Sequence, residues 1–351
     1  MNKNNIYLPN VTFFRFIAAL WIVFYHFGVT MTSNIDKTIL SRVVSNGFQA
    51  VSFFYVLSGF IMAYLYYSSF QNNQFQLFKF WKARFTRIYP AYFAALVCCF
   101  LLYTYWGNEI HLVDSILEFL CLQTWNWGSF PGYNYPDWSI SVEFFFYLVF
   151  PLIMKKFIVL STTVITWVVL IFWLTSQCIY NVIDLDSQKI FEDFPLFHLS
   201  SFIIGLFGGV LFFRYNTFMI KINFFKLFIA LLLMSIILIS IHFFFGMKEN
   251  IGLYAPIFLL LIIIFVVDRT FFSILFANRT ANYLGEISYD IYIFQYPVYI
   301  LSKIIAEKFQ IKTESLFFLF SFVLLLILFS IFTHKFIDKK IRKLILERIT
   351  K

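Results

Sequence analysis

The chain has 351 residues, of which 61% are hydrophobic and 13% are charged, and its formal net charge is +9. Soluble domains are roughly half apolar and a quarter charged, so this composition excludes an ordinary soluble fold. The basic residues lie in short segments between apolar runs, as topology signals do, which argues against a nucleic-acid-binding protein.

Long apolar runs separated by short polar breaks make up most of the sequence. A helix needs about 20 apolar residues to cross a bilayer, so these runs predict about ten membrane-spanning helices. The predicted spans are residues 11–30, 48–69, 90–107, 138–154, 157–177, 195–213, 224–246, 251–267, 283–302 and 315–334. We therefore predict an all-α, polytopic integral membrane protein with a single membrane domain over residues 1–351, a core of about 10–335 and no appended soluble domain.

The orientation follows from the distribution of Lys and Arg, which gather at the N-terminus, in the even-numbered loops and at the C-terminus. The positive-inside rule then places the N- and C-termini in the cytosol. The first apolar run contains Arg15 and His26 and lacks a small-residue cleavage site, which argues against a removable signal peptide. Cys121 and Cys178 fall on one predicted face of the membrane without metal-ligand spacing, and the sequence leaves open whether they form a disulfide.

Arg15 and His26 are ionisable groups inside the first span, where a charge is costly and normally serves a function. Helical geometry brings them to within about 20° of one face, with about 16 Å between them along the axis. Arg15 is expected near the cytosolic end and His26 in the outer half of the membrane. The alternative interpretation is a snorkelling arginine with a hydrogen-bonded structural histidine.

Glu143 lies in the fourth span, about 7 Å from its outer end, and His26 lies about 6 Å from the same end of its own span. A carboxylate level with an imidazole can pair with it and raise its basicity towards that of a general base. The matching depths therefore predict a pair of His26 and Glu143, which serves either catalysis or structure.

The predicted cytosolic segment 71–89 carries Arg84 and Arg87 at the mouth of the third span. Two arginines three residues apart on a helical turn form a fork that suits phosphate. Basic segments at such positions also serve simply to fix the orientation of the chain, and that interpretation stays open.

Polar residues also begin the ninth span at its cytosolic end, namely Ser288, Tyr289, Asp290 and Tyr292. Depths of about 10 Å for Asp290 and about 6 Å for Arg15 are compatible with a salt bridge between them. Basic groups at the mouth, polar groups in the inner half and an imidazole near the outer face together suggest a route for a coenzyme. Such a coenzyme would have a phosphorylated head and a long thin arm that ends in a thioester.

The predicted external segment 108–137 is rich in Trp, Tyr, Gly and Pro. Trp125, Asp137 and Trp138 have the aromatic rings and the carboxylate that sugar binding requires, so they are candidates for contact with an acceptor. Aromatic belts at membrane surfaces have the same composition and are the alternative interpretation.

These features together resemble the acyltransferase-3 family of bacterial membrane O-acyltransferases. Five motifs in order carry the resemblance: Phe14–Leu20 with Tyr25–Phe27, Phe54–Phe60, Arg84 with Arg87–Pro90, Trp138–Ser139 with Glu143 and Tyr147–Pro151, and Gly285–Tyr289 with Tyr292. Two positions depart from the pattern, because Ser52 stands where many members carry Asp and Gln295 stands where many carry His.

The resemblance implies ten core helices in the bacterial inner (cytoplasmic) membrane. It implies transfer of an acyl group, usually acetyl, from cytosolic acyl-CoA to a hydroxyl of a cell-surface or lipid-linked glycan, with no metal cofactor. We expect a catalytic group of His26, Glu143 and Arg15. The candidates for coenzyme binding are Arg15, Ser58, Arg84, Arg87, Ser288, Tyr289 and Tyr292.

The chemical hypothesis is that His26, oriented by Glu143, removes the proton of an acceptor hydroxyl as it attacks the thioester. A transient acyl-imidazole on His26 is the other route, and the sequence does not choose between the two. The alternative function is a transporter or export subunit for a glycan or a small anion, which the lack of an inverted repeat disfavours. The sequence sets neither the acceptor sugar nor the oligomeric state.

Overall fold

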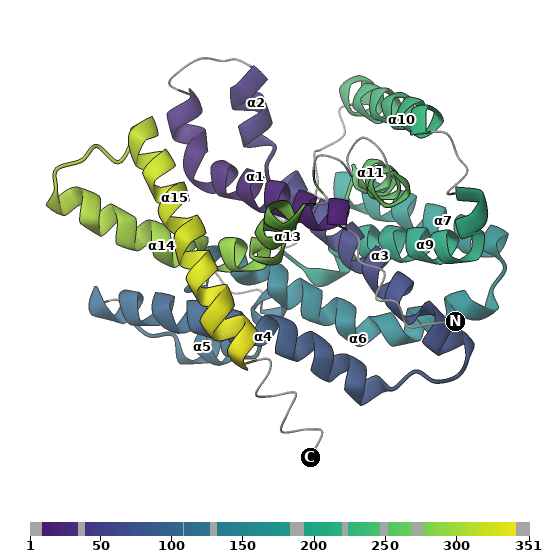
Figure 1. The fold of residues 1–351 in the computed structure, drawn as a ribbon, viewed down its shortest axis with the longest axis horizontal. Coiled ribbons are helices and arrows are strands. Elements are labelled where there is room, and N and C mark those ends of the chain that lie inside the picture. Colours follow the sequence, from purple (N-terminus) through teal and green to yellow (C-terminus); the bar gives the residue numbers. More distant parts are fainter. Residues whose placement is uncertain are drawn as a thin grey trace.

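The computed structural model describes residues 9–33, 39–107, 109–126, 132–182, 193–219, 224–245, 252–268, 276 and 278–341. Within these ranges the regular secondary structure is helical throughout, which confirms the all-α prediction (Figure 1). The longer helices are α1 (Pro9–Ser33), α3 (Gln49–Gln71), α4 (Leu77–Tyr105), α6 (Trp138–Val159), α7 (Thr162–Val182), α9 (Pro195–Met219), α10 (Phe224–Phe245), α11 (Ala255–Val267), α14 (Ser288–Lys308) and α15 (Leu316–Thr333). Shorter helices are α2 (Ile39–Ser45), α5 (Leu112–Phe119) and α13 (Arg279–Glu286).

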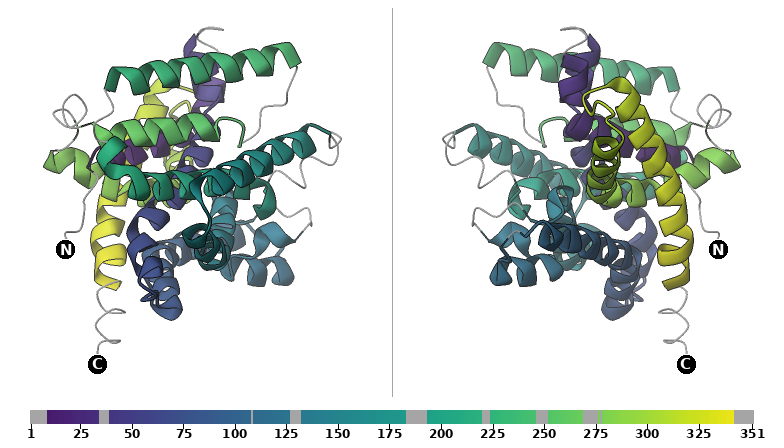
Figure 2. Two further views of the ribbon diagram at one scale, coloured as in Figure 1. Left: turned by 90° about the vertical axis from the view of Figure 1, so that its right-hand side faces the viewer. Right: turned by 90° about the vertical axis from the view of Figure 1, so that its left-hand side faces the viewer.

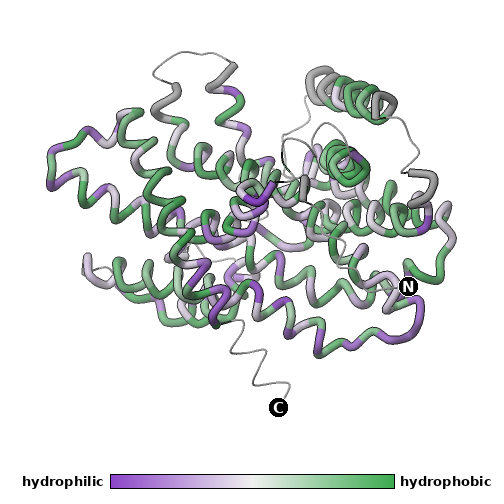
Figure 3. Tube along the Cα trace, viewed as in Figure 1, coloured by the Kyte–Doolittle hydropathy of each residue, from purple (hydrophilic) through white to green (hydrophobic). Residues whose placement is uncertain are grey.

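Each predicted span overlaps one of the longer helices, although several ends differ by five residues or more. Helices are expected where lipid offers no hydrogen bonds to the backbone. Six described helical stretches are long and apolar enough to cross a membrane: Val11–Val29, Gln49–Gln71, Leu77–Tyr105, Thr162–Val182, Pro195–Tyr215 and Leu316–Ile341. Hydrophobic residues cover most of these helices, and a hydrophilic stretch marks the connection from α3 to α4 (Figure 3). The protein is therefore a multi-pass membrane protein.

Two differences between the predicted spans and the helices bear on the site and on membrane crossing. Helix α4 begins at Leu77, so most of the segment expected to be a basic loop is helical. Lys and Arg are good helix formers, and the helix continues through Pro90. Helix α11 has 13 residues, which at 1.5 Å per residue gives about 20 Å, less than the hydrocarbon thickness.

Close contact between α3 and α9 forms the centre of the bundle and depends on glycines. A Cβ atom on Gly205 of α9 would lie 1.9 Å from the carbonyl oxygen of Val56 on α3, and one on Gly59 would lie 2.1 Å from the carbonyl oxygen of Phe202. Only hydrogen fits at these positions, so the two backbones pack directly against each other.

The remaining helices surround this pair. Helix α1 packs on α13 and α14, while α6 packs on α3 and α9. Helix α15 packs across α14 at one side, and α10 lies at the edge opposite α4 (Figures 1 and 2). All four cysteines are free, so Cys121 and Cys178 are not joined in this structure.

Candidate active site

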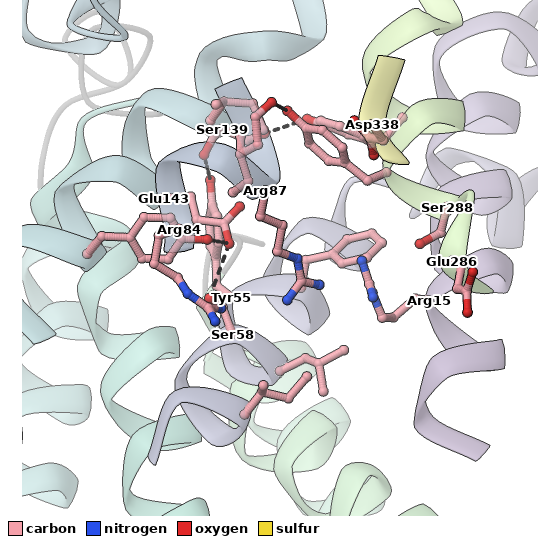
Figure 4. A pocket seen from close by; sticks show the side chains of 18 of the residues that line it. Arg15, Tyr55, Ser58, Arg84, Arg87, Ser139, Glu143, Glu286, Ser288 and Asp338 are labelled. Atoms are coloured by element: carbon pink, nitrogen blue, oxygen red, sulfur yellow. Dashed lines mark hydrogen bonds between the residues drawn. The ribbon is translucent and has the colours of Figure 1, made fainter. Parts of the chain in front are cut away.

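A cavity of about 420 Å³ lies where α1, α3, α4, α6, α13 and α14 meet, closed on one side by a π-helical turn at His334–Asp338 (Figure 4). This volume is in the usual range of ligand pockets. Every residue that the sequence proposes for coenzyme binding lines the cavity, and so does Glu143: Arg15, Ser58, Arg84, Arg87, Glu143, Ser288, Tyr289 and Tyr292.

Three arginines from two helices give part of the cavity a basic wall. Arg15 comes from α1, and Arg84 and Arg87 come from one turn of α4 (Figure 4). The Arg84 guanidinium lies 5.8 Å from the ring centre of Tyr66 and donates a hydrogen bond of 3.5 Å to its hydroxyl. The Arg84 Nε atom is buried without a hydrogen-bond partner, so it has a donor to offer to a ligand.

Glu143 lies in the same cavity and accepts two hydrogen bonds there. The Tyr147 hydroxyl donates to its Oε1 atom at 2.5 Å, and the Ser58 hydroxyl donates to the same atom at 3.2 Å. The indole of Trp81 on α4 donates to the carbonyl oxygen of Tyr147 at 3.0 Å. These contacts tie α3, α4 and α6 together around the carboxylate.

His26 has a different partner from the predicted one. Its Nδ1 atom lies 2.9 Å from Oε1 of Gln295 on α14, and its ring meets the edge of the Tyr135 ring at 5.4 Å. The predicted pair of His26 and Glu143 is therefore wrong. Matching depth gives only height in the membrane, whereas α1 packs on α14 and α6 packs on α3 and α9.

His26 does not line the cavity, but the cavity reaches Tyr292 on α14, close in sequence to the hydrogen-bond partner of His26. At this end the Tyr292 hydroxyl donates to the carbonyl oxygen of Pro136 at 2.6 Å and lies 2.7 Å from the Ser139 hydroxyl. Gln295 follows Tyr292 by three residues on α14, a rise of about 4.5 Å. The cavity thus reaches within one helical turn of the residue that holds His26.

The π-helical turn after α15 also contributes side chains to the cavity, which the sequence motifs did not indicate. Nδ1 of His334 lies 3.2 Å from Oδ2 of Asp290 and 3.5 Å from Oδ2 of Asp338, and Thr333 donates to Asp290 at 2.8 Å. The predicted salt bridge of Asp290 with Arg15 is therefore wrong. The spacing of four residues between His334 and Asp338, which places both side chains on one helix face, was the sequence signal for this cluster.

The same cluster contains side chains of the kinds that bind metal ions. One ligand atom each from Asp290, His334 and Asp338 lie within 4.8 Å of one another. Beside it, Lys339 and Glu286 form an ion pair of 3.1 Å, and Glu286 also lies 3.6 Å from Nε2 of His334. An ion-pair network that joins α13, α14 and the π-helical turn therefore explains the cluster as well as a metal site does.

The candidates for acceptor binding lie in and beside the connection between α4 and α6, and none of them lines the cavity. Trp125 is partly exposed and packs edge-on against Phe145, while the Trp138 ring lies 5.3 Å from that of His198. Asp137 is buried, and its Oδ1 atom accepts a hydrogen bond from Gln123 at 3.0 Å. Its carboxylate therefore serves the packing of the connection in this structure.

A second buried carboxylate, Glu118, lies beside Asp137. Its oxygens accept hydrogen bonds from the backbone nitrogens of Tyr133, at 2.8 and 3.0 Å, and Asn134, at 3.2 Å. Burial raises the pKa of Glu118, and burial together with the neighbouring charge of Glu118 raises the pKa of Asp137 well above its usual range. The pair therefore holds protons more tightly than free carboxyl groups do.

The arrangement is that of a polytopic helical membrane protein with an arginine-lined polar cavity, and comparison with known families identifies its class. A family model described as an acyltransferase domain matches residues 8–334. The chain belongs to this acyltransferase-3 family, as its motifs predict. No solved structure matches the chain.

Several curated proteins resemble the chain. It is 24% identical to the O-acetyltransferase OatA of Staphylococcus aureus, covering 96% of this chain and 57% of that protein. It is 26% identical to the peptidoglycan O-acetyltransferase OatA of Listeria monocytogenes over 43% of this chain and 25% of that protein. It is 31% identical to the acyltransferase MdmB of Streptomyces mycarofaciens over 41% of this chain and 38% of that protein. The matches thus span between a quarter and about three fifths of the length of these relatives.

Proposed function

We propose that this protein is a membrane O-acetyltransferase that moves an acetyl group from cytosolic acetyl-CoA to a hydroxyl of a cell-surface or lipid-linked glycan. Family membership supports acyl transfer. The names of the two OatA relatives support O-acetylation, and that of the Listeria protein supports a peptidoglycan-like acceptor. The observation that carries the proposal is the cavity that has three arginines on its wall and reaches Tyr292, one helical turn from the partner of His26.

The charge of the cavity wall supports a coenzyme with phosphate groups. Arg84 and Arg87 bind its phosphates, because a planar guanidinium pairs with phosphate oxygens through two parallel hydrogen bonds. Ser288 and Tyr289 line the path of the thin arm towards Tyr292 and Ser139. The distribution of basic residues supports a cytosolic entrance, since α4 begins with the basic segment that the positive-inside rule assigns to the cytosol.

In the proposed reaction the acceptor hydroxyl oxygen attacks the thioester carbonyl carbon. The new C–O bond forms as the C–S bond breaks, Nε2 of His26 takes the hydroxyl proton, and the imidazolium returns a proton to the sulfur of the departing coenzyme. Tyr292 and Ser139 must part for the thioester to reach His26. Glu143 acts in the cavity wall, where it holds Ser58 and Tyr147.

Purified protein given labelled acetyl-CoA and a glycan acceptor tests this proposal. Loss of a general base typically costs about 10²- to 10⁴-fold, so His26→Ala should reduce transfer at least 100-fold without changing expression or membrane insertion. The control is His111→Ala, which removes an exposed imidazole just before α5. Full transfer by His26→Ala refutes the assignment. Glycan movement across vesicles without acetyl transfer would favour the transporter function.

A further inference from the structure

We infer that Gln295 is a positioning residue that fixes the proton of His26 on Nδ1 and so presents Nε2 as the base. This inference rests on the proposed function for its catalytic meaning. Its structural basis is a pair of hydrogen bonds made by one buried amide, which links α14 to α1.

The orientation of the Gln295 amide follows from its second partner. Its Nε2 atom donates a hydrogen bond of 2.8 Å to the carbonyl oxygen of Tyr292. Its oxygen is therefore the atom that lies 2.9 Å from Nδ1 of His26. The reversed amide would place two oxygens against each other, and Gln295 is fully buried, so the orientation shown is the one that satisfies both groups.

The tautomer of His26 follows from this orientation. An amide oxygen only accepts hydrogen bonds, so Nδ1 must carry the hydrogen and donate it. In a neutral imidazole the other ring nitrogen then keeps its lone pair. The Nε2 atom of His26 is thus held as an acceptor, which is the form that a general base requires.

A proline in α14 helps to build the other side of the imidazole. Pro297 has no N–H group, so the carbonyl oxygen of Ile293, four residues earlier, lacks its usual helical donor. The buried side chain of Asn134 donates to that oxygen at 3.1 Å. This bond anchors the segment whose next residue, Tyr135, places its ring against His26.

An amide at position 295 differs from a carboxylate in one way that matters for a base. It directs the imidazole proton without adding a negative charge that would favour the imidazolium. His26 then stays in its neutral, active form to lower pH than it would beside a carboxylate. Gln295 therefore sets both which nitrogen acts and the pH range in which it acts.

Substitutions at position 295 test this inference in the purified full-length protein. Gln295→Met keeps the length of the side chain but loses both hydrogen bonds, so kcat should fall about 10- to 100-fold while KM for acetyl-CoA stays within about twofold. Gln295→Glu keeps an acceptor and should recover part of kcat, with the acidic limb of the pH–rate profile moved to higher pH. Ser302→Ala, which alters a buried hydroxyl two turns further along α14, should match the unmodified protein.

Alkylation with iodoacetamide gives a readout that does not depend on turnover. Peptide analysis should find His26 of the unmodified protein alkylated at Nε2 alone and that of Gln295→Met alkylated at both nitrogens. The same isomer mixture in both proteins, or an unchanged kcat in Gln295→Met, overturns the inference. If His26 of the unmodified protein is alkylated only at Nε2 but the protein transfers no acetyl group, the proposed function fails. The assignment of the tautomer then still stands.

Discussion

Charge is distributed unevenly among the side chains of the cavity. Glu286 and Asp338 lie within ion-pair distance of Lys339 and His334 at the end formed by α13 and the π-helical turn. On α4, Arg84 contacts the neutral side chain of Tyr66 and keeps a free donor. The part of the cavity beside the α4 arginines therefore suits an anion, and we propose that it binds the phosphates of the coenzyme.

The first prediction concerns these arginines. Hydrogen bonds to charged groups contribute about 1.5–3 kcal/mol each, so Arg84→Ala combined with Arg87→Ala should weaken CoA binding at least tenfold, as measured by calorimetry in detergent. The matched control is Lys79→Ala, an exposed basic residue at the start of α4 that does not line the cavity. Equal affinity for CoA in the double variant and the control would show that this segment serves only to orient the chain in the membrane.

The second prediction concerns the buried carboxyl groups between α4 and α6. A carboxyl group whose pKa is raised by folding stabilises the protein below its ordinary pKa, near 4, and this contribution is lost as pH rises through the raised value. Asp137→Asn should therefore flatten the decline of the melting temperature as the pH rises above about 4. Glu109→Gln, at an exposed carboxyl in the same connection, should leave the slope as it is. The same dependence of melting temperature on pH in Asp137→Asn and in the unmodified protein would contradict this prediction. It would show that Glu118 and Asp137 do not link stability to pH.

Two kinds of contact fix the helices around the cavity. Glycines let α3 and α9 touch backbone to backbone. Near the C-terminal end of α9, Arg214 donates to the carbonyl oxygens of Phe157 and Ile158, at 2.7 and 3.2 Å. These carbonyls belong to the last turn of α6 and lack helical donors, so the arginine caps α6 and ties its end to α9.

The third prediction tests the helix contact. Gly205→Ala places a methyl group 1.9 Å from the backbone oxygen of Val56, which cannot move aside as a side chain could. Overpacking of this kind costs about 1–3 kcal/mol, so the variant should melt several degrees below the unmodified protein in detergent. Gly28→Ala is the control, because its Cβ would meet side-chain atoms only at ordinary distances of 3.5 Å or more. A Gly205→Ala protein as stable as Gly28→Ala would show that α3 and α9 are not in this close contact.

For the molecule as a whole, the sequence predicted the helices and the composition of the cavity better than it predicted partners. Long apolar runs locate helices because, in lipid, the backbone N–H and C=O groups of a span must form their hydrogen bonds with each other. Ionisable residues within spans pointed to Arg15 and Glu143, which both line the cavity. The partner of His26 could not be derived, since one sequence gives heights along each helix but not the order of helices around the bundle. Gln295 was noticed only as a departure from the family pattern, and its contact with His26 required the packing of α1 on α14.

We propose that acetyl-CoA from the cytosolic side serves a base near the opposite face of the membrane. Sealed vesicles of known orientation measure this directly, with labelled acetyl-CoA on one side and a membrane-impermeant glycan acceptor on the other. We predict acetylated acceptor only when the coenzyme is on the side of the α4 arginines, and none with His26→Ala. Acetylation that requires coenzyme and acceptor on the same side, or that persists in His26→Ala, would contradict the account.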